Sequence, residues 1–195
     1  MKSAFLLRAK KVITFFLLMQ FTFLLASAQV SYFAKDDLNL LVSGTSTLHD
    51  WDLKAAKGDC KAIFNFDKDG QLTSISELSL VTPAEALKSG HSGMDKNAYK
   101  SLKTDKHKNI TFVFSSGKVN ADGTINCIGK LTIAGVTHDA ELLANYKMNP
   151  DKSISINGNK KINMLYYNME PSTFMGGMFK VGDEVNLKFD LTLHK

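Results

Sequence analysis

Apolar and polar side chains alternate along the end of this chain. One apolar set occupies every second position: Val185, Leu187, Phe189, Leu191 and Leu193. A period of two places alternate side chains on opposite faces of a β-strand. The same alternation recurs within residues 38–42, 60–66, 110–114, 125–133, 140–146 and 154–164. The pattern therefore predicts a chain built mainly of strands, each with one apolar and one polar face.

Turn residues separate these runs and favour antiparallel connections. Residues 69–70 and 122–123 read Asp-Gly, and residues 149–151 read Asn-Pro-Asp; all three are typical of tight turns. Gly158 stands inside a strand run, where it indicates a bulge or a sharp bend. About eight antiparallel strands with one apolar face form a sandwich or a closed barrel. We expect one all-β domain over residues 29–195.

Residues 82–103 break the β rhythm. Met94, Ala98 and Leu102 share one face at helical spacing, and Asp95 is a suitable residue to cap the helix N-terminus. We expect one or two short helices that cross from one strand to the next.

The first 28 residues have the three parts of a secretory signal peptide. Residues 1–11 contain four basic residues, an apolar run covers residues 12–25, and residues 26–28 read Ala-Ser-Ala. The apolar run is too short for a good membrane span. We expect cleavage after Ala28 and a periplasmic or secreted protein.

Removal of this segment changes the charge of the chain. Because the segment carries four basic residues and no acidic ones, the net charge falls from +5 to +1. The remaining lysines are scattered among aspartate and glutamate, without the basic stripe that nucleic-acid binding needs. We therefore expect no nucleic-acid partner.

The residue pattern does not favour catalysis. The five histidines show no metal-ligand spacing to another His, Cys or Glu, and the chain has no nucleophile elbow or phosphate-binding glycine loop. We expect no catalytic residue, no metal ligand and no cofactor. Cys60 and Cys127 take apolar-side positions in strands. Their spacing leaves open a disulfide or two buried thiols.

Four segments, in order, resemble the YceI-like family. They are residues 44–51 (Gly-Thr-Ser-Thr-Leu-His-Asp-Trp), 94–95 with 109–112, 129–137 and 181–185. The resemblance covers essentially the whole chain after the signal peptide. It implies an extended, eight-stranded antiparallel lipocalin-like barrel with a short helical crossover. It also implies that a long-chain isoprenoid or other apolar lipid is the partner, held in an apolar lumen.

Lipid binding requires a lumen that its own side chains do not fill. Large phenylalanines on the apolar faces alternate with small residues, which favours free space. The ten residues expected to contact lipid are Leu40, Val42, Phe64, Phe66, Phe112, Phe114, Leu131, Ile133, Phe189 and Leu191. His49 and Trp51 are expected at the barrel mouth. For any one of these phenylalanines, ordinary core packing is the favoured role.

Two other functions stay open. Met164, Met169, Met175 and Met178 cluster near the end of the chain, and their thioethers suit copper or haem iron in an exported redox or stress protein. A barrel with a filled core would instead serve as an interaction module of the cell envelope. The sequence also leaves open whether the barrel forms a homodimer.

Overall fold

The computed structural model describes residues 28–35 and 38–195. The strands are β1 (Ala28–Lys35), β2 (Leu38–Ser46), β3 (Trp51–Ala55), β4 (Asp59–Phe66), β5 (Leu72–Pro83), β6 (Asn109–Val119), β7 (Thr124–Ile133), β8 (Val136–Met148), β9 (Ile154–Asn163), β10 (Thr173–Phe174) and β11 (Phe179–Leu193). The helical segments are α2 (Ser92–Leu102) and the short turns η2 (Ala84–Ala86), η3 (Leu165–Tyr167) and η4 (Met175–Gly177). The predicted signal peptide lies outside the described residues except for Ala28. Within those residues, no helix is long and apolar enough to cross a membrane.

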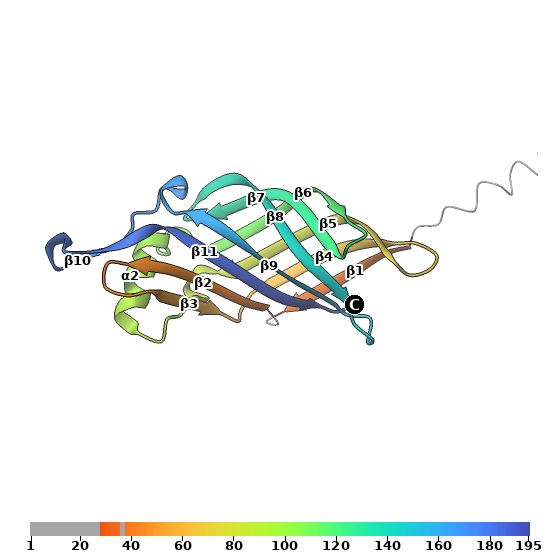
Figure 1. Cartoon of the computed structure of the whole chain (residues 1–195), viewed down its shortest axis with the longest axis horizontal. Helices are drawn as coiled ribbons and strands as arrows, with labels where there is room; N and C mark the ends of the chain where they lie inside the picture. Colours follow the sequence, from red (N-terminus) through yellow and green to blue (C-terminus); the bar gives the residue numbers. More distant parts are fainter. Residues whose placement is uncertain (1–27, 36–37) are drawn as a thin grey trace, which may run out of the picture.

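The strands form one antiparallel sheet that curls on itself (Figure 1). The order of neighbours is β1-β4-β5-β6-β7-β8-β9-β11-β2-β3, and β10 pairs with β11. The backbones of Phe33 in β1 and His194 after β11 exchange hydrogen bonds of 2.7 and 2.8 Å. Lys54 in β3 pairs in the same way with Lys88 after β5. These pairs bring the edges of the sheet together, and the predicted lipocalin-like barrel is confirmed.

The sheet that forms the barrel has ten strands along its path, not the predicted eight, and β10 lies off this path. β1 and β2 follow one another and pair with β4 and β3, which also follow one another. β1 and β2 together therefore take the place of one long strand of the barrel, and β3 and β4 together take the place of a second. β10 adds a two-residue arm next to the start of β11. A period of two identifies the side of each residue but does not show where a long strand is interrupted.

Gly158 does not form the expected bulge. The pairing of β9 with β11 runs without a register shift from Asn163–Glu184 to Ile154–Leu193. A Cβ atom at Gly158 would lie 2.6 Å from the ring of Phe189, so the glycine permits the ring to approach the backbone. β8 and β9 pair only as far as Ala144–Gly158, and η3 then contacts both strands.

The crossover between β5 and β6 contains η2 and α2, as predicted. Asp95 is not the N-cap, because α2 begins after His91. Its carboxylate instead accepts hydrogen bonds of 2.7 Å from the backbone N–H and the hydroxyl of Ser89. These two bonds hold the pKa of Asp95 below its ordinary value. They attach the first turn of α2 to the loop before it.

Candidate functional site

The barrel and α2 enclose an apolar cavity of about 630 Å³. Side chains from strands on all sides of the barrel line it, and α2 covers part of its open end. None of the described residues that line it is Lys, Arg, Asp or Glu. Because an unpaired buried charge is costly, this wall suits an uncharged, apolar occupant.

The structure brings seven of the ten expected lipid-binding residues to this cavity. They are Leu40, Val42, Phe112, Leu131, Ile133, Phe189 and Leu191. They belong to β2, β6, β7 and β11, and all except Val42 are less than 9% exposed. That they contact a lipid stays a prediction.

Phe64, Phe66 and Phe114 do not line the cavity. The rings of Phe64 and Phe66 lie 5.5 and 6.1 Å from the ring of Tyr32 in β1. This aromatic group fills the interior next to β1 and β4. Phe114 is half-buried beside a break in the β6–β7 register, and its ring occupies the space above Gly117. Alternation assigned the side of the strand correctly for Phe64 and Phe66 but carried no information on depth along the barrel.

The turn after β2 holds His49 and Trp51 beside the cavity opening. The Ser46 hydroxyl donates to the carbonyl of His49 at 2.7 Å and accepts the backbone N–H groups of Leu48 and His49. The imidazole Nδ1 of His49 donates to the Asp50 carbonyl at 2.7 Å. The indole of Trp51 donates to the Thr45 carbonyl at 3.1 Å. Both predicted mouth residues line the cavity.

A side chain at Gly44 would overlap the Trp51 ring. Glycine at this position therefore allows the indole to lie flat on β2. Trp51 is half-buried and lines the cavity. This close packing explains why the first sequence motif carries glycine and tryptophan seven residues apart.

The helix α2 supplies part of the wall that the ten expected residues omit. Met94, Ala98 and Leu102 line the cavity, on the apolar face that the spacing predicted. The hydroxyl of Ser101 donates to the Glu170 carbonyl at 2.8 Å. The ammonium group of Lys103 donates to the Asn168 carbonyl, also at 2.8 Å. The end of the helix is thus attached to the chain segment that leads to β10.

Other wall residues, which are not among the ten expected lipid contacts, follow the same period of two. They are Leu53, Leu80, Ile125, Leu142, Ala144, Ile156, Ile162, Val185 and Leu187. Several of them belong to the alternating runs of the sequence, so the signal was present. The alternation did not distinguish them from core residues elsewhere in the barrel.

Cys60 and Cys127 are free, buried thiols that line the same cavity. Burial raises the pKa of Cys60 to about 12 and that of Cys127 to about 11. Both thiols are therefore neutral at physiological pH and are poor nucleophiles. In this cavity they act as small apolar wall residues.

The C-terminal methionines have two different environments. Met164 and Met169 are buried and line the cavity, whereas Met178 is 71% exposed. Among the described residues, no group of three or more His, Cys, Asp or Glu side chains could hold a metal ion. Met164 and Met169 act as flexible apolar wall residues, and the side chain of Met175 lies outside the described part of the chain.

Three solved structures share this fold. BcnA from Burkholderia cenocepacia is 18% identical, with a TM-score of 0.64 over 78% of this chain and 95% of that chain. The YceI protein from Campylobacter jejuni is 21% identical, with a TM-score of 0.55 over 70% and 81%. A polyisoprenoid binding domain from Saccharophagus degradans, implicated in plant cell wall breakdown, is 12% identical, with a TM-score of 0.61 over 86% and 99%. At these identities the likeness establishes the fold alone.

A comparison with curated protein sequences gave no significant match. A comparison with protein-family models gave a match over most of the chain: residues 26–193 match the YceI-like domain. That range includes all the strands and the helix that enclose the cavity. The chain therefore belongs to the YceI-like domain family.

Proposed function

We propose that this chain is an exported protein that binds a long-chain isoprenoid or similar lipid in its barrel cavity and catalyses no reaction on it. The observation that carries the proposal is the cavity itself, which is open at one end and lined by no described charged side chain. Its polar lining groups gather near α2 and the turn after β2, where a small head group would lie. The name of the Saccharophagus degradans neighbour, a polyisoprenoid binding domain, supports this ligand class.

The size of the cavity favours a long hydrocarbon chain. Association costs on the order of 4–15 kcal/mol, and burial of one isoprene unit contributes only about 4 kcal/mol. One methylene group occupies about the volume of a water molecule, about 30 Å³. The cavity of about 630 Å³ therefore has room for roughly 20 carbon atoms, or about four isoprene units. Such a tail offers enough apolar surface to exceed the association cost.

Export is part of the proposal. The basic start, apolar run and Ala-Ser-Ala of residues 1–28 support it. Amino-terminal sequencing of the protein from the periplasm or medium of its host tests this point. A mature chain that begins at Gln29 is expected, and a chain that retains the first 28 residues in the cytoplasm would contradict export.

The other candidate functions have less support. A filled-core interaction module needs an interior occupied by its own side chains, whereas this interior contains a cavity of about 630 Å³. A metal or haem site in the methionine-rich segment needs its thioethers to converge. The buried Met164 and the exposed Met178 lie in different surroundings.

Native mass spectrometry of protein purified from its own host tests lipid binding. We expect a co-purifying apolar mass, and a uniformly unliganded protein would contradict the proposal. Ala144→Phe fills the cavity and is expected to reduce the bound fraction at least tenfold. Leu143→Phe is the matched control, because Leu143 is the next residue and is 59% exposed on the outer face. Circular dichroism verifies that both variants fold; equal lipid content in the two would count against the cavity as the binding site.

A further inference from the structure

The most exposed large apolar side chains gather at the mouth of the barrel. Among the large apolar side chains of the described residues, those of Met178, Leu48 and Tyr166 have the highest exposed fractions, 71%, 63% and 62%. They belong to three segments at the α2 end of the barrel: the turn 47–50, the turn η3 and the hairpin arm 173–179. We call these three segments the mouth loops. Exposed apolar side chains that stand singly are ordinary, but three around the opening of an apolar cavity form a potential contact surface.

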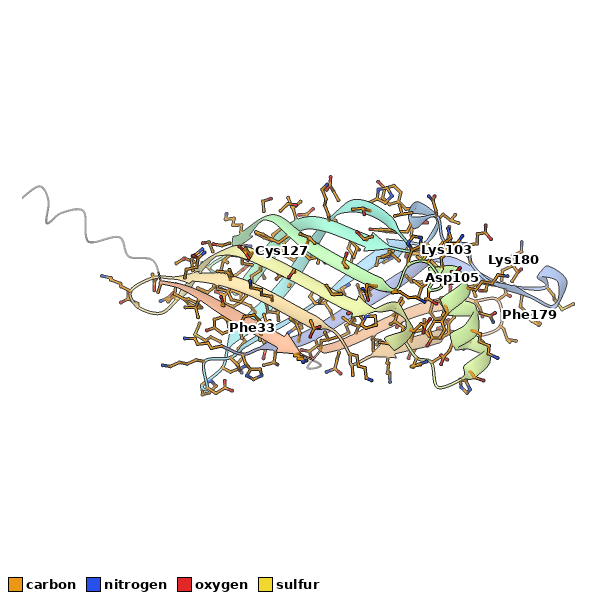
Figure 2. The ribbon with its side chains drawn as sticks, turned by 180° about the vertical axis from the view of Figure 1, so that it is seen from behind. Phe33, Lys103, Asp105, Cys127, Phe179 and Lys180 are labelled. Carbon is orange, nitrogen blue, oxygen red and sulfur yellow. The ribbon has the colours of Figure 1, made fainter. Side chains whose placement is uncertain are left out.

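The mouth loops are structurally connected to the cavity. Leu48 lines the opening, and so does Phe179, the residue after Met178. The Thr47 N–H donates to the Lys180 carbonyl at 3.0 Å, and the Lys180 N–H donates to the Thr47 hydroxyl at 3.1 Å. These bonds hold the turn 47–50 beside the base of the hairpin arm. Figure 2 shows Phe179 and Lys180 at this end, beyond the strands that form the barrel wall.

The hairpin arm projects away from the rest of the protein. Gly176 and Gly177 have φ angles of 70° and 93°, and a Cβ atom at either would meet no atom within 4 Å. Figure 1 shows β10 extending past the end of the barrel. Tyr166 is held differently: its ring stacks on His138 with centroids 3.8 Å apart, and its carbonyl lies 2.8 Å from the His138 Nε2. The exposed apolar side chains of the mouth loops therefore project from a hairpin that extends past the barrel and from a turn held by His138.

Lysines outnumber acidic residues in the α2 segment, which covers this end of the barrel. Residues 85–108 contain six lysines and three acidic residues. Lys96, Lys100, Lys106 and Lys108 are exposed, and no described carboxylate lies within 4.0 Å of their ammonium groups.

Two of the three acids in this segment make internal hydrogen bonds. Glu85 accepts the Thr104 hydroxyl at 2.9 Å, and Asp95 accepts the bonds from Ser89. Asp105 is exposed in the same segment, and Asp50, Asp52, Glu170, Asp183 and Glu184 are exposed in or next to the mouth loops, so the excess of lysine lies on the α2 side of the mouth. Apolar side chains beside a lysine-rich helical segment match the chemistry that binds the interface of an anionic bilayer.

We propose that the mouth loops dock on the surface of an anionic lipid bilayer, with Met178, Leu48 and Tyr166 among the head groups. The inference rests on the proposed lipid-binding function and specifies where the protein takes up or delivers its lipid. When the mouth is docked, a lipid tail can pass between the bilayer and the cavity without crossing water. Exposing the tail to water would cost about 0.8 kcal/mol for each methylene group.

Vesicle flotation tests the docking, using the protein as purified from its own host. One set of vesicles contains phosphatidylethanolamine and phosphatidylglycerol, and the other contains phosphatidylcholine alone. We expect binding to the anionic vesicles that weakens at high salt. Met178→Asp combined with Tyr166→Asp should lower the partition coefficient at least tenfold; neither residue lines the cavity. Lys96→Gln combined with Lys100→Gln should reduce binding to the anionic vesicles alone.

Leu143→Asp is the control for the apolar substitutions, because Leu143 is 59% exposed on the wall of β8, away from the mouth loops. Docking is overturned if wild-type protein floats with neither set of vesicles. It is also overturned if Leu143→Asp loses as much binding as the mouth variant.

Uptake of geranylgeraniol added from ethanol, measured by native mass spectrometry, separates the two proposals. Normal uptake without vesicle binding refutes docking only. Vesicle binding without uptake refutes lipid binding in the cavity and leaves the membrane contact standing.

Discussion

The substitution Phe112→Asp measures whether the lumen is a dry and uncharged space. Phe112 is 4% exposed and lines the cavity. Loss of its ring is expected to remove about 3–5 kcal/mol of stability, as for other buried phenylalanines. The new carboxylate adds a second cost, because no Lys or Arg is among the described lining residues to pair with it.

The second cost has a defined pH dependence. Burial raises the pKa of the new carboxyl in the folded state, while the unfolded state keeps the ordinary value. The folded state therefore binds more protons, and stability falls as pH rises. The expected slope is about 1.4 kcal/mol per pH unit above about pH 4, and the loss approaches about 4 kcal/mol near neutral pH.

Urea unfolding followed by circular dichroism, at mildly acidic and at neutral pH, measures both terms. Phe112→Asn removes the same ring without adding a charge and should show no slope relative to wild type. Val113→Asp places the carboxylate on the outer face, where Val113 is 53% exposed, and should cost little at either pH. The reasoning is refuted if Phe112→Asp loses no more stability than Val113→Asp. An equal loss at both pH values would also refute it.

Three further substitutions or treatments test the walls of the barrel. Thr82 is fully buried, and its hydroxyl has no hydrogen-bond partner among the described residues. Thr82→Val should therefore raise the free energy of unfolding by about 1 kcal/mol; a lower urea midpoint would contradict this. A Cβ atom at Gly129 would lie 2.5 Å from the Phe112 ring, so Gly129→Ala should cost about 1–3 kcal/mol. Adding Phe112→Leu to Gly129→Ala should restore part of the lost stability, measured by thermal unfolding. Because burial raises the pKa of both thiols, Cys60 and Cys127 should resist iodoacetamide at neutral pH until the protein is unfolded; fast labelling of folded protein would argue against their burial.

The fold class could be predicted because its signal is local. Alternation over a few residues establishes a strand and the two sides of that strand, whatever the strand later pairs with. The run from Val185 to Leu193 reads the same in the sequence and in β11, where Val185, Phe189, Leu191 and Leu193 are buried. The apolar face of α2 was predictable for the same reason, since Met94, Ala98 and Leu102 need only helical spacing.

The position of the cavity along the barrel had no comparable signal. Phe64 and Phe112 occupy equivalent positions in their alternating runs, yet Phe112 borders the cavity and Phe64 packs against Tyr32. Depth depends on strand register and on partners distant in sequence. Phe64, for example, lies opposite Val30 and Ile75.

The hairpin arm and the mouth loops belong to the same category. The sequence indicated an opening near His49 and Trp51, but not that Met178 and Tyr166 would stand beside it. By itself, the sequence determined that this chain forms strands with one apolar face, connected by tight turns and one helical crossover. Only the tertiary structure decided which apolar residues line the cavity and which fill the rest of the interior. That outcome depends on how strands distant in sequence align when the sheet curls.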